Sequence, residues 1–295
     1  MAESLPFALL GGLPGAVGWA AARLSALSLD PRGGWGTYGA MVEIKRKAAL
    51  VTGGARRIGR AIALDLAAQG WAVAIHYNHS RADADSLVAK IQAAGGRAIA
   101  VRADLCVESE VKALLPATAP LGALTLLVNN ASTFERDDVA DATRASWDLH
   151  MEANLRAPFV LSQAFAAQLP ATEQGLIVNI IDQRVWNLTP HFISYTLSKA
   201  GLWTLTRTLA MALAPRIRVN GIGPGPTLRN DRQSEEQFSA QWDATPLRRG
   251  TSPEEIAATV RYLINAPAVT GQMIALDGGE HLGWAQPSRG FVPEE

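Results

Sequence analysis

The sequence predicts a single doubly wound α/β domain of the Rossmann type, a seven-stranded parallel sheet with helices on both faces. Strand-like and helix-like segments alternate over residues 44–284. The seven strand-like segments are continuous apolar runs, which is typical of parallel strands buried on both faces. A glycine-rich turn joins the first run to the first helix, as in the βαβ units of this fold class.

The elements follow one another in a regular order. The first helix follows the first strand, because Ile58, Ile62 and Leu66 recur at helical spacing and Gly70 ends the run. The strand-like runs cover residues 47–52, 71–77, 97–105, 124–130, 175–181, 217–225 and 273–279. The later helical segments are one ending near Gly95, a short one after the third strand, and two long ones over residues 143–169 and 190–213.

Composition excludes several classes of partner. Lys plus Arg equal Asp plus Glu at 27 each, so the chain lacks the broad positive field that nucleic acids or anionic membranes require. The single cysteine, Cys106, cannot form an internal disulfide, and no histidines stand near it at metal-ligand spacing. We therefore expect small-molecule partners or further copies of the chain, a cytoplasmic location, and no nucleic acid, membrane or metal.

Residues 1–43 differ from the rest of the chain. They are rich in Gly and Ala, and Pro6, Pro14 and Arg23 interrupt their apolar run, whereas a membrane span takes about 20 mostly apolar residues. We interpret them as a flexible extension or as an upstream start read as coding, with an interfacial helix over residues 15–28 as the alternative. Residues 285–295 form a C-terminal tail. We expect deletion of residues 1–40 to leave a folded, active protein.

The stretch "TGGARRIG", residues 52–59, is a candidate phosphate-binding turn. Gly53, Gly54 and Gly59 allow a tight turn and a close approach of the backbone to a pyrophosphate at the helix N-terminus. Its place between a strand and a helix strengthens a motif that is weak by itself. Arg57 and Ile58 lie in the same turn and are further candidate contacts.

The end of the second strand, "IHYNHSR", favours NADPH over NADH. An NAD enzyme places an acid about 20 residues after the glycines, and this stretch contains no carboxylate. Its side chains and Arg57 offer donors for a 2′-phosphate. The candidate contacts are His76, Tyr77, Asn78, His79 and Ser80, with Arg81 beside them. The alternative is an ordinary polar turn.

Three groups that can move or orient protons lie within residues 179–199. Tyr195 and Lys199 are four residues apart and share a helix face, so the ammonium can lie near the phenol and lower its pKa. Without such help a phenol is a poor acid–base catalyst at neutral pH. Asp182 follows the apolar run of the fifth strand, where it is either a turn acid that caps backbone N–H groups or a catalytic group.

Together these motifs resemble the short-chain dehydrogenase/reductase family over residues 47–283. The resemblance rests on "TGGARRIG", "ADL", "NNAS", Asn154, "YTLSK", "GPGPT" and "DGG". It implies that Asp104 holds the adenine end, that Asn130 fixes the fourth strand beside the cofactor, and that Asn154 orders a water behind Lys199. Residues 224–227 would pass over the nicotinamide, and Lys199 would reach its ribose. Further implied cofactor contacts are Leu105, Ala131, Ser132, Pro224, Gly225 and Thr227.

Asp182 departs from the wider family, which usually has a serine there to hydrogen-bond a substrate carbonyl. The pteridine reductases and the dihydromonapterin or dihydrofolate reductases of short-chain type carry an aspartate at this place. The chain also resembles that branch in Arg57, in His76 and Tyr77, in Phe134, and in the ending "VTGQMIALDGGEHL". The resemblance implies NADPH-dependent reduction of a dihydropterin. The implied catalytic residues are Asp182, Tyr195, Lys199 and Asn154, and the implied substrate contacts are Arg57, Ser132, Phe134, Asp182 and Tyr195.

The chemistry of pterin reduction explains why an aspartate suits this position. Reducing a pterin C=N bond needs a hydride at carbon and a proton at nitrogen, so no oxyanion forms and an acid such as Asp182 fits. Phe134 would stack on the flat pterin, although an aromatic side chain near a strand end is commonly part of the core. A ketone or alcohol dehydrogenase of the same fold and a non-catalytic cofactor sensor remain alternatives.

We expect residues 227–250 to form the substrate loop, with Trp186 and Trp242 either lining it or packing against other side chains. We also expect a homotetramer that forms through the two long helices and the last strand.

Overall fold

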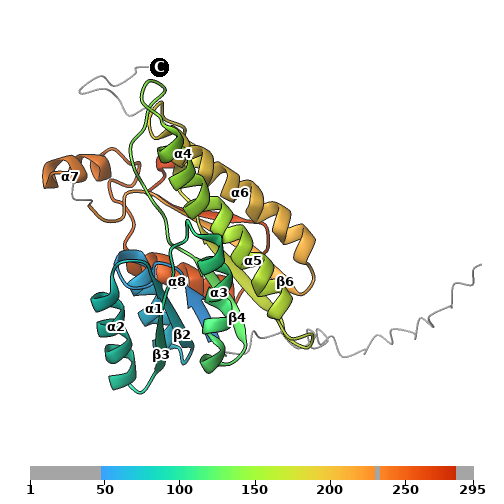
Figure 1. Ribbon diagram of the computed structural model, residues 1–295. Coiled ribbons are helices and arrows are strands. Elements are labelled where there is room, and N and C mark those ends of the chain that lie inside the picture. The colour runs from blue at the N-terminus through green and yellow to red at the C-terminus, as the bar shows by residue number, and fades with distance from the viewer. Residues whose placement is uncertain (1–47, 230–232, 284–295) are drawn as a thin grey trace, which may run out of the picture. The chain divides into compact units, whose positions relative to one another are not determined.

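The computed structural model describes residues 48–229 and 233–283. Its centre is a seven-stranded sheet in the order β3-β2-β1-β4-β5-β6-β7, in which all neighbouring strands are parallel (Figure 1). The predicted doubly wound fold is confirmed. The strands are β1 (Ala48–Val51), β2 (Ala72–Tyr77), β3 (Arg97–Arg102), β4 (Leu124–Asn129), β5 (Gly175–Ile180), β6 (Ile217–Pro224) and β7 (Met273–Leu276).

The central strands are buried along their whole length. Every residue of β4, "LTLLVN", and of β5, "GLIVNI", is buried, which is why these strands are apolar runs rather than alternating ones. The chain passes from β1 outward to β3 and then returns to place β4 on the other side of β1. This reversal opens a crevice beyond the carboxyl ends of β1 and β4, where ligands of such folds bind.

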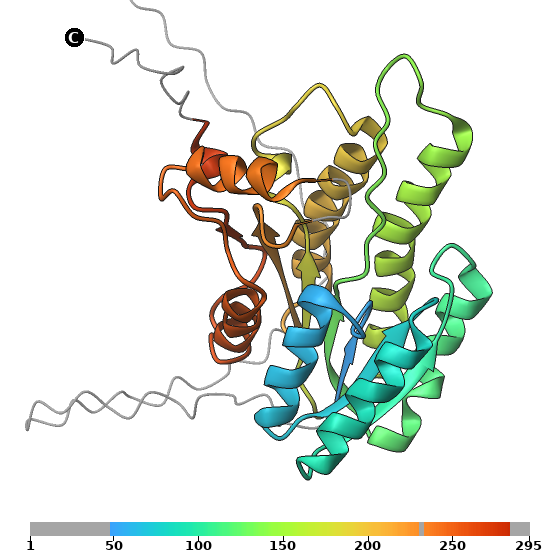
Figure 2. The same ribbon diagram turned by 90° about the vertical axis from the view of Figure 1, so that its left-hand side faces the viewer.

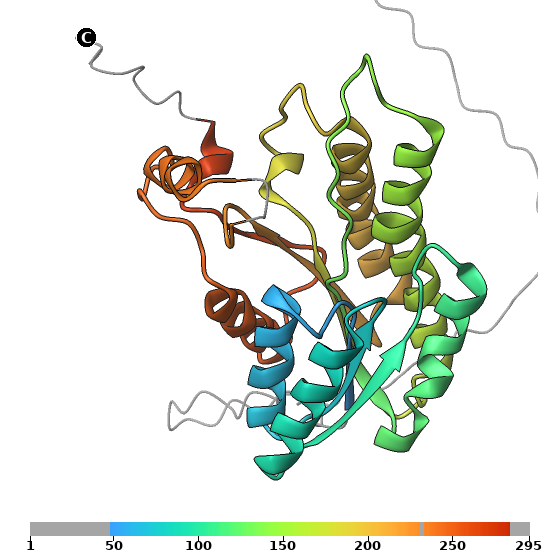
Figure 3. The same ribbon diagram turned by 60° about the vertical axis from the view of Figure 1, so that its left-hand side comes forward.

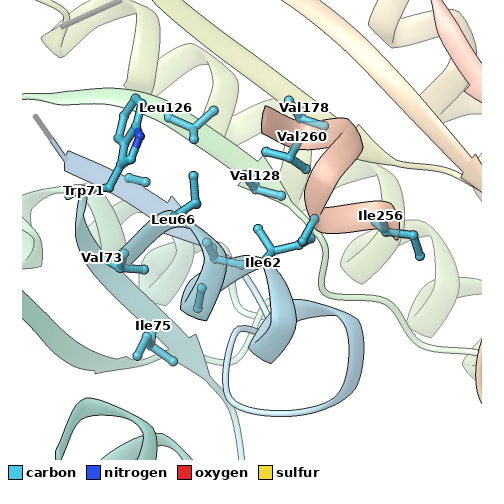
Figure 4. Packing of buried hydrophobic residues seen from close by; sticks show 14 of the residues in the cluster. Ile62, Leu66, Trp71, Val73, Ile75, Leu126, Val128, Val178, Ile256 and Val260 are labelled. Carbon is cyan, nitrogen blue, oxygen red and sulfur yellow. The ribbon is translucent and has the colours of Figure 1, made fainter. Parts of the chain in front are cut away.

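Helices cover both faces of the sheet. One face carries α1 (Arg57–Ala68), α2 (Arg81–Ala93) and α8 (Pro253–Ile264), and the other carries α3 (Glu108–Ala117), α5 (Ala157–Gln168) and α6 (Ile193–Leu213). Figure 4 shows how Ile62 and Leu66 of α1 pack with Val260 of α8 over the strands. Burying such a side chain completely stabilises the fold by about 1.5–3 kcal/mol. The buried side chains of the opposite face include Val111, Leu114, Leu161, Phe165, Leu209 and Ala210.

The long helix predicted over residues 143–169 is interrupted. It consists of α4 (Arg144–Met151), a single π-helical turn (Glu152–Arg156) and α5, which run on from one another beside α6 (Figure 1). Pro158 has no N–H to donate to the carbonyl of Asn154, four residues earlier, which disrupts the α-helical pattern at this point. The turn places Asn154, a predicted catalytic residue, in the buried interior.

The predicted substrate loop contains a helix. Residues Glu235–Asp243 form α7, which begins with a capping box between Ser234 and Gln237. Figure 2 shows α7 at the same end of the molecule as the loops after β4 and β5, and Figure 3 shows this arrangement from another side. Helix α7 therefore lies at the end of the sheet where the strands have their carboxyl ends.

Two predictions about the termini lie outside the described residues. They are the extension over residues 1–43, with its alternative helix over residues 15–28, and the tail over residues 285–295. Among the helices of the described ranges, none has the length and apolar character needed to cross a membrane.

Candidate active site

Two neighbouring cavities lie beyond the carboxyl ends of the strands. The Gly53 cavity, of about 540 Å³, is lined by the glycine turn and by the ends of β2, β3 and β4. The Tyr195 cavity, of about 590 Å³, is lined by the segments that follow β5 and β6. Four residues line both cavities: Arg57, Ile58, Asn130 and Ser132. The two cavities therefore adjoin, as the two halves of a dinucleotide and substrate site would.

The glycine turn is shaped by close backbone approaches. Gly53 has φ +60°, and a Cβ on Gly59 would lie 2.2 Å from the Gly53 carbonyl oxygen. Asn130 Nδ2 donates to the carbonyl oxygens of Thr52 at 2.8 Å and of Gly53 at 3.2 Å, so it ties β4 to the turn. No side chain caps the N-terminus of α1, which begins at Arg57. Its first N–H groups are thus available to an anion.

The His76 ring connects the glycine turn to the segment that follows β3. Its Nδ1 accepts a hydrogen bond from the Gly53 N–H at 3.0 Å, and its Nε2 lies 3.1 Å from the carbonyl oxygen of Ala103. Burial lowers the pKa of His76 to about 4, although the Ala103 hydrogen bond and the Asp104 charge oppose this change. The ring is therefore neutral with both nitrogens engaged, and the predicted donation from His76 to a 2′-phosphate is wrong.

The other predicted cofactor contacts divide into two groups. Tyr77 packs against the hydrophobic core and Ser80 precedes α2, and neither lines the Gly53 cavity. These two predicted contacts are therefore not brought to the cavity. The predicted residues that do line it are Gly53, Arg57, Ile58, Gly59, His76, Asn78, His79, Asp104, Leu105, Asn130, Ala131 and Ser132. Pro224, Gly225, Thr227 and Lys199 line the adjoining Tyr195 cavity.

Asp182, Tyr195 and Lys199 meet at one wall of the Tyr195 cavity. The Tyr195 hydroxyl donates to Asp182 Oδ2 at 2.7 Å, and Asp182 Oδ1 accepts from the backbone N–H of Arg184 at 2.8 Å. Lys199 Nζ donates to the carbonyl oxygen of Ile180 at 2.9 Å and lies 5.8 Å from the centroid of the Tyr195 ring. Asp182 thus both caps a turn and contacts the phenol, so the two interpretations of the residue are compatible.

The ionisation of Tyr195 differs from the prediction. Burial, and then the negative charge of Asp182, raise the pKa of Tyr195 well above its ordinary value. The predicted lowering by Lys199 is wrong for this arrangement, because the buried Tyr195 hydroxyl is hydrogen-bonded to Asp182, whereas the Lys199 ammonium donates to the carbonyl oxygen of Ile180. Burial also lowers the pKa of Lys199 to about 8, against the opposing charge of Asp182.

The side chain of Asn154 holds the loop after β4 to α6. Its Oδ1 accepts from the Thr133 N–H at 2.9 Å and from Ser132 Oγ at 3.1 Å. Its Nδ2 donates to the Thr133 carbonyl oxygen at 3.0 Å and to Ser198 Oγ at 3.1 Å. This side chain has no group left for the predicted water. Such a role would fall to the main-chain carbonyl, whose α-helical partner position is occupied by Pro158.

An aromatic pair adjoins Tyr195 in the wall of the Tyr195 cavity. Phe134 stacks on Phe192 with ring centroids 4.5 Å apart and planes 8° apart, and its edge meets the Tyr195 ring at 4.6 Å. The Arg184 guanidinium lies over the Phe192 ring, 5.1 Å from its centroid. Phe134 therefore lies in the cavity wall as predicted, but one of its faces is covered by a residue of the chain itself.

Arg57 and Trp242 hold the segment after β6. Arg57 donates to the carbonyl oxygens of Leu228 and Arg229 at 3.0 and 3.1 Å. Trp242 Nε1 on α7 donates to the Pro226 carbonyl oxygen at 3.0 Å. The predicted substrate loop is thus fastened both to the glycine turn and to α7.

Comparisons with known proteins decide the family. A family model described as enoyl-(acyl carrier protein) reductase matches residues 53–281. A 3-oxoacyl-[acyl-carrier-protein] reductase from Synechocystis sp. is 34% identical over 244 residues, which cover 81% of this chain and 98% of the relative. The chain belongs to the short-chain dehydrogenase/reductase family.

Two solved structures are also similar. FolM alternative dihydrofolate reductase 1 from Brucella suis, in complex with NADP, is 50% identical with a TM-score of 0.80, covering 83% of this chain and 98% of that one. A blue fluorescent protein from a metagenomic library, in complex with NADPH, is 33% identical with a TM-score of 0.74, covering 79% and 97%. The similarity thus extends along nearly the whole of both solved chains.

Sequence reasoning missed several residues of this short-chain reductase site. Arg184, Phe192 and Glu280 line the Tyr195 cavity, as do Phe238 and Gln241 of α7. The αL conformation of Phe192, φ +59°, gives no signal in the sequence, and Glu280 reaches the cavity only because β7 lies beside β6. Trp186 packs against Trp203 and His281 and does not line the cavity. Within the described residues, no group of three or more His, Cys, Asp or Glu is placed to hold a metal ion.

Proposed function

We propose that the chain reduces a dihydropterin to its tetrahydro form with NADPH as cofactor. The observation that carries the proposal is the hydrogen bond between Tyr195 and Asp182 in a cavity that adjoins the Gly53 cavity. The 50% identity to the FolM structure supports the same substrate class. The 34% identity to a 3-oxoacyl reductase favours a second candidate, the reduction of a carbonyl.

The Gly53 cavity fits a dinucleotide with a 2′-phosphate. The turn requires glycine at position 59, because a Cβ there would lie 2.2 Å from the Gly53 carbonyl oxygen, and the uncapped N-terminus of α1 favours an anion. Arg56 and Arg57 of the glycine turn and His79 after β2 offer donors, and Asp104, the one carboxylate among the described residues that line the cavity, follows β3 rather than β2. NADPH, when bound there, would supply the hydride for the substrate carbon. Lys199 and residues 224–227 would hold its nicotinamide end.

The Asp182–Tyr195 pair would supply the proton. A phenol whose pKa is raised well above its ordinary value is by itself a weak acid, so Tyr195 alone is a poor proton donor. We assign to Asp182 the transfer of the proton to the ring nitrogen, and to Tyr195 the hydrogen bond that orients this carboxyl group. The carboxylate left after the transfer takes up its next proton from solvent. Phe134 and Phe192 would provide the flat apolar wall that a pterin ring requires.

The same pair disfavours the reduction of a carbonyl. Reduction of a ketone develops negative charge on oxygen, which needs hydrogen-bond donors or positive charge nearby. A carboxylate at Asp182 would repel that charge. Reduction of a C=N bond places the new proton on nitrogen and develops no oxyanion.

Turnover assays separate the two candidates. NADPH oxidation is measured with 7,8-dihydromonapterin, 7,8-dihydrobiopterin and 7,8-dihydrofolate, and with acetoacetyl thioesters as 3-oxoacyl substrates. The proposal expects turnover of at least one dihydropterin and little of the thioesters. Turnover of the thioesters alone would overturn it. A kcat/KM with NADH equal to that with NADPH would overturn the assignment of the cofactor.

A further inference from the structure

Glu280 is a carboxylate of the Tyr195 cavity for which the mechanism above has no role. It is the first residue of the short helical turn Glu280–Leu282 that follows β7. Its backbone is fixed by hydrogen bonds from Asn187 Nδ2 to its carbonyl oxygen and from its N–H to Asp277, both 3.2 Å. The side chain lines the Tyr195 cavity together with Asp182. It also lines a neighbouring cavity of about 230 Å³ beyond the first.

One oxygen of this carboxylate lacks a partner. Glu280 Oε2 is shielded from solvent and accepts no hydrogen bond from the residues that the structure describes. It packs against the backbone of Gly225, where an added Cβ would lie 3.2 Å from it. Buried polar atoms are nearly always hydrogen-bonded, because an unmade bond is costly. Because Glu280 lines the cavity and this oxygen of its carboxylate is unpaired among the described residues, a hydrogen-bond donor on a ligand would satisfy the group.

The charge of Glu280 determines which substituents of a ligand can lie beside it. Burial, followed by the charges of Asp182 and Asp277, raises the pKa of Glu280 to about 6, while Arg184 opposes the change. At neutral pH the side chain is therefore mostly ionised. An ionised carboxylate accepts hydrogen bonds from O–H and N–H groups and repels an anionic substituent.

The proposed chemistry indicates which part of the substrate lies there. In a 7,8-dihydropterin the bond to be reduced joins ring nitrogen 5 to ring carbon 6, and the substituent is attached to that same carbon. If Asp182 delivers the proton to nitrogen 5, the first atoms of the substituent lie within a few bonds of Asp182. Glu280 lines the same cavity as Asp182. The amino-substituted edge of the pterin is at the far end of the ring system.

We infer that Glu280 accepts a hydrogen bond from a hydroxyl group on the substituent at ring position 6, and so selects dihydropterins with a hydroxylated side chain. This inference rests on the proposed function and deepens it. The 230 Å³ cavity on the far side of Glu280 gives the remainder of the side chain a place to extend. Glu280 is thus a specificity-determining residue rather than a member of the proton-transfer pair.

The test compares two substrates that differ in this donor. The full chain is assayed with 7,8-dihydromonapterin, which has a hydroxylated side chain, and with 6-methyl-7,8-dihydropterin, which has none. Glu280→Met keeps the length of the side chain and removes the acceptor, and Glu280→Gln keeps a neutral acceptor. Glu254→Met removes an exposed carboxylate on α8 and serves as the matched control. Melting temperature and NADPH affinity report whether each variant is folded.

We expect Glu280→Met to lower kcat/KM for the hydroxylated substrate by about tenfold or more, the scale of a hydrogen bond to a charged group. The 6-methyl substrate should change little, and Glu280→Gln should retain part of the preference. An equal loss for both substrates, or a wild type that does not distinguish them, would overturn the inference and leave the proposed function standing. Failure of the wild type to reduce either substrate would instead contradict the proposed function itself. If Glu280→Met does not fold, the comparison uses Glu280→Gln. A smaller preference for the hydroxylated substrate with little change for the 6-methyl substrate supports the inference, and an unchanged preference or an equal loss for both substrates overturns it.

Discussion

Asp182 serves two neighbours at once. One carboxyl oxygen caps the turn at Arg184 and the other accepts from the Tyr195 hydroxyl. A capping residue alone would affect stability by about 0.5–2 kcal/mol, whereas a proton donor would affect the rate of the chemical step. Substitutions that keep the shape of the side chain distinguish these effects.

Asp182→Asn should lower kcat for a dihydropterin by roughly 10²-fold, the scale of one general acid, and leave NADPH affinity nearly unchanged. The amide can still accept from the Arg184 N–H, so the melting temperature should shift little. Steady-state kinetics and thermal unfolding measure the two effects separately. Asp141→Asn, at an exposed carboxylate that caps another turn, is the control. A kcat close to that of the wild type would reduce Asp182 to a structural role.

Lys199 should give the enzyme an alkaline limit. Because its pKa is about 8, the ammonium is lost as pH rises through that value, and kcat/KM should fall there with it. A pH–rate profile measures the limit. In Lys199→Met the alkaline fall should be absent from whatever activity remains. A wild-type profile that stays flat from pH 7 to pH 9 would contradict the assignment.

The same group affects stability in a definite direction. The folded pKa of Lys199 lies below its ordinary value of 10.5, so between about pH 8 and 10.5 the unfolded chain binds more protons than the folded one. The contribution of this group to stability therefore rises with pH across that window. The cost of burying the ammonium is present in full below pH 8. Thermal unfolding of the wild type and of Lys199→Met should accordingly converge as pH rises.

At the scale of elements, the loop after β4 and the start of α6 together build the aromatic wall. Phe134→Ala should raise KM for a dihydropterin several times more than KM for NADPH, because the ring faces the Tyr195 cavity. Phe192→Ala exposes the covered face of Phe134 and should have the smaller effect on KM. Kinetics with each ligand varied in turn measure both. Equal changes in the two KM values for Phe134→Ala would show that the ring packs the loop and does not contact the substrate.

The strands and most helices could be predicted from the sequence, because burial on both faces leaves a continuous apolar run. Strand β4 was predicted over residues 124–130 and is observed over Leu124–Asn129. Helix α7 was predicted as loop because it buries none of its residues, so it has no apolar period to detect. The π turn was not predicted, since its cause is the missing N–H of Pro158 within an otherwise helical pattern.

The site was predictable only where a residue type is itself the signal. The glycines, Tyr195, Lys199 and Asp182 stand at positions that chemistry requires. His76 was misjudged because its two ring nitrogens find backbone partners in the glycine turn and beyond β3, which only the fold brings together. The ionisation of Tyr195 was misjudged for a similar reason, since burial and distance to Asp182 are properties of the packed structure.

At the scale of the whole molecule, deletion of residues 1–40 should leave the enzyme active. Every described residue that lines the Gly53 cavity or the Tyr195 cavity falls between Gly53 and Glu280, and β1 begins at Ala48. The truncated protein should keep its melting temperature and kcat/KM within a factor of about two. Expression of a folded truncation without turnover would show that these residues contribute to the site.

The chain should assemble as a tetramer, as predicted from the family resemblance. Helix α6 carries apolar side chains on its surface, with Leu197 46% and Met211 75% exposed, and such side chains are commonly covered by a second copy. Light scattering at micromolar concentration measures the assembly. A monomer at that concentration would contradict the prediction.

The hydrogen bonds of Asn154 have a consequence for motion. One buried amide, in the π-helical turn between α4 and α5, is hydrogen-bonded both to the loop after β4 and to α6, which are far apart along the chain. The loop cannot move away from the cavity without breaking bonds that also anchor the long helix. Its opening is then cooperative with that of the helix, and the Thr133 N–H, although it belongs to no strand or helix, should exchange with solvent deuterium as slowly as the amides of the helical core. The loop after β4 should therefore open as rarely as the helical core does. The Asp182–Tyr195 pair should accordingly face the same cavity wall throughout turnover.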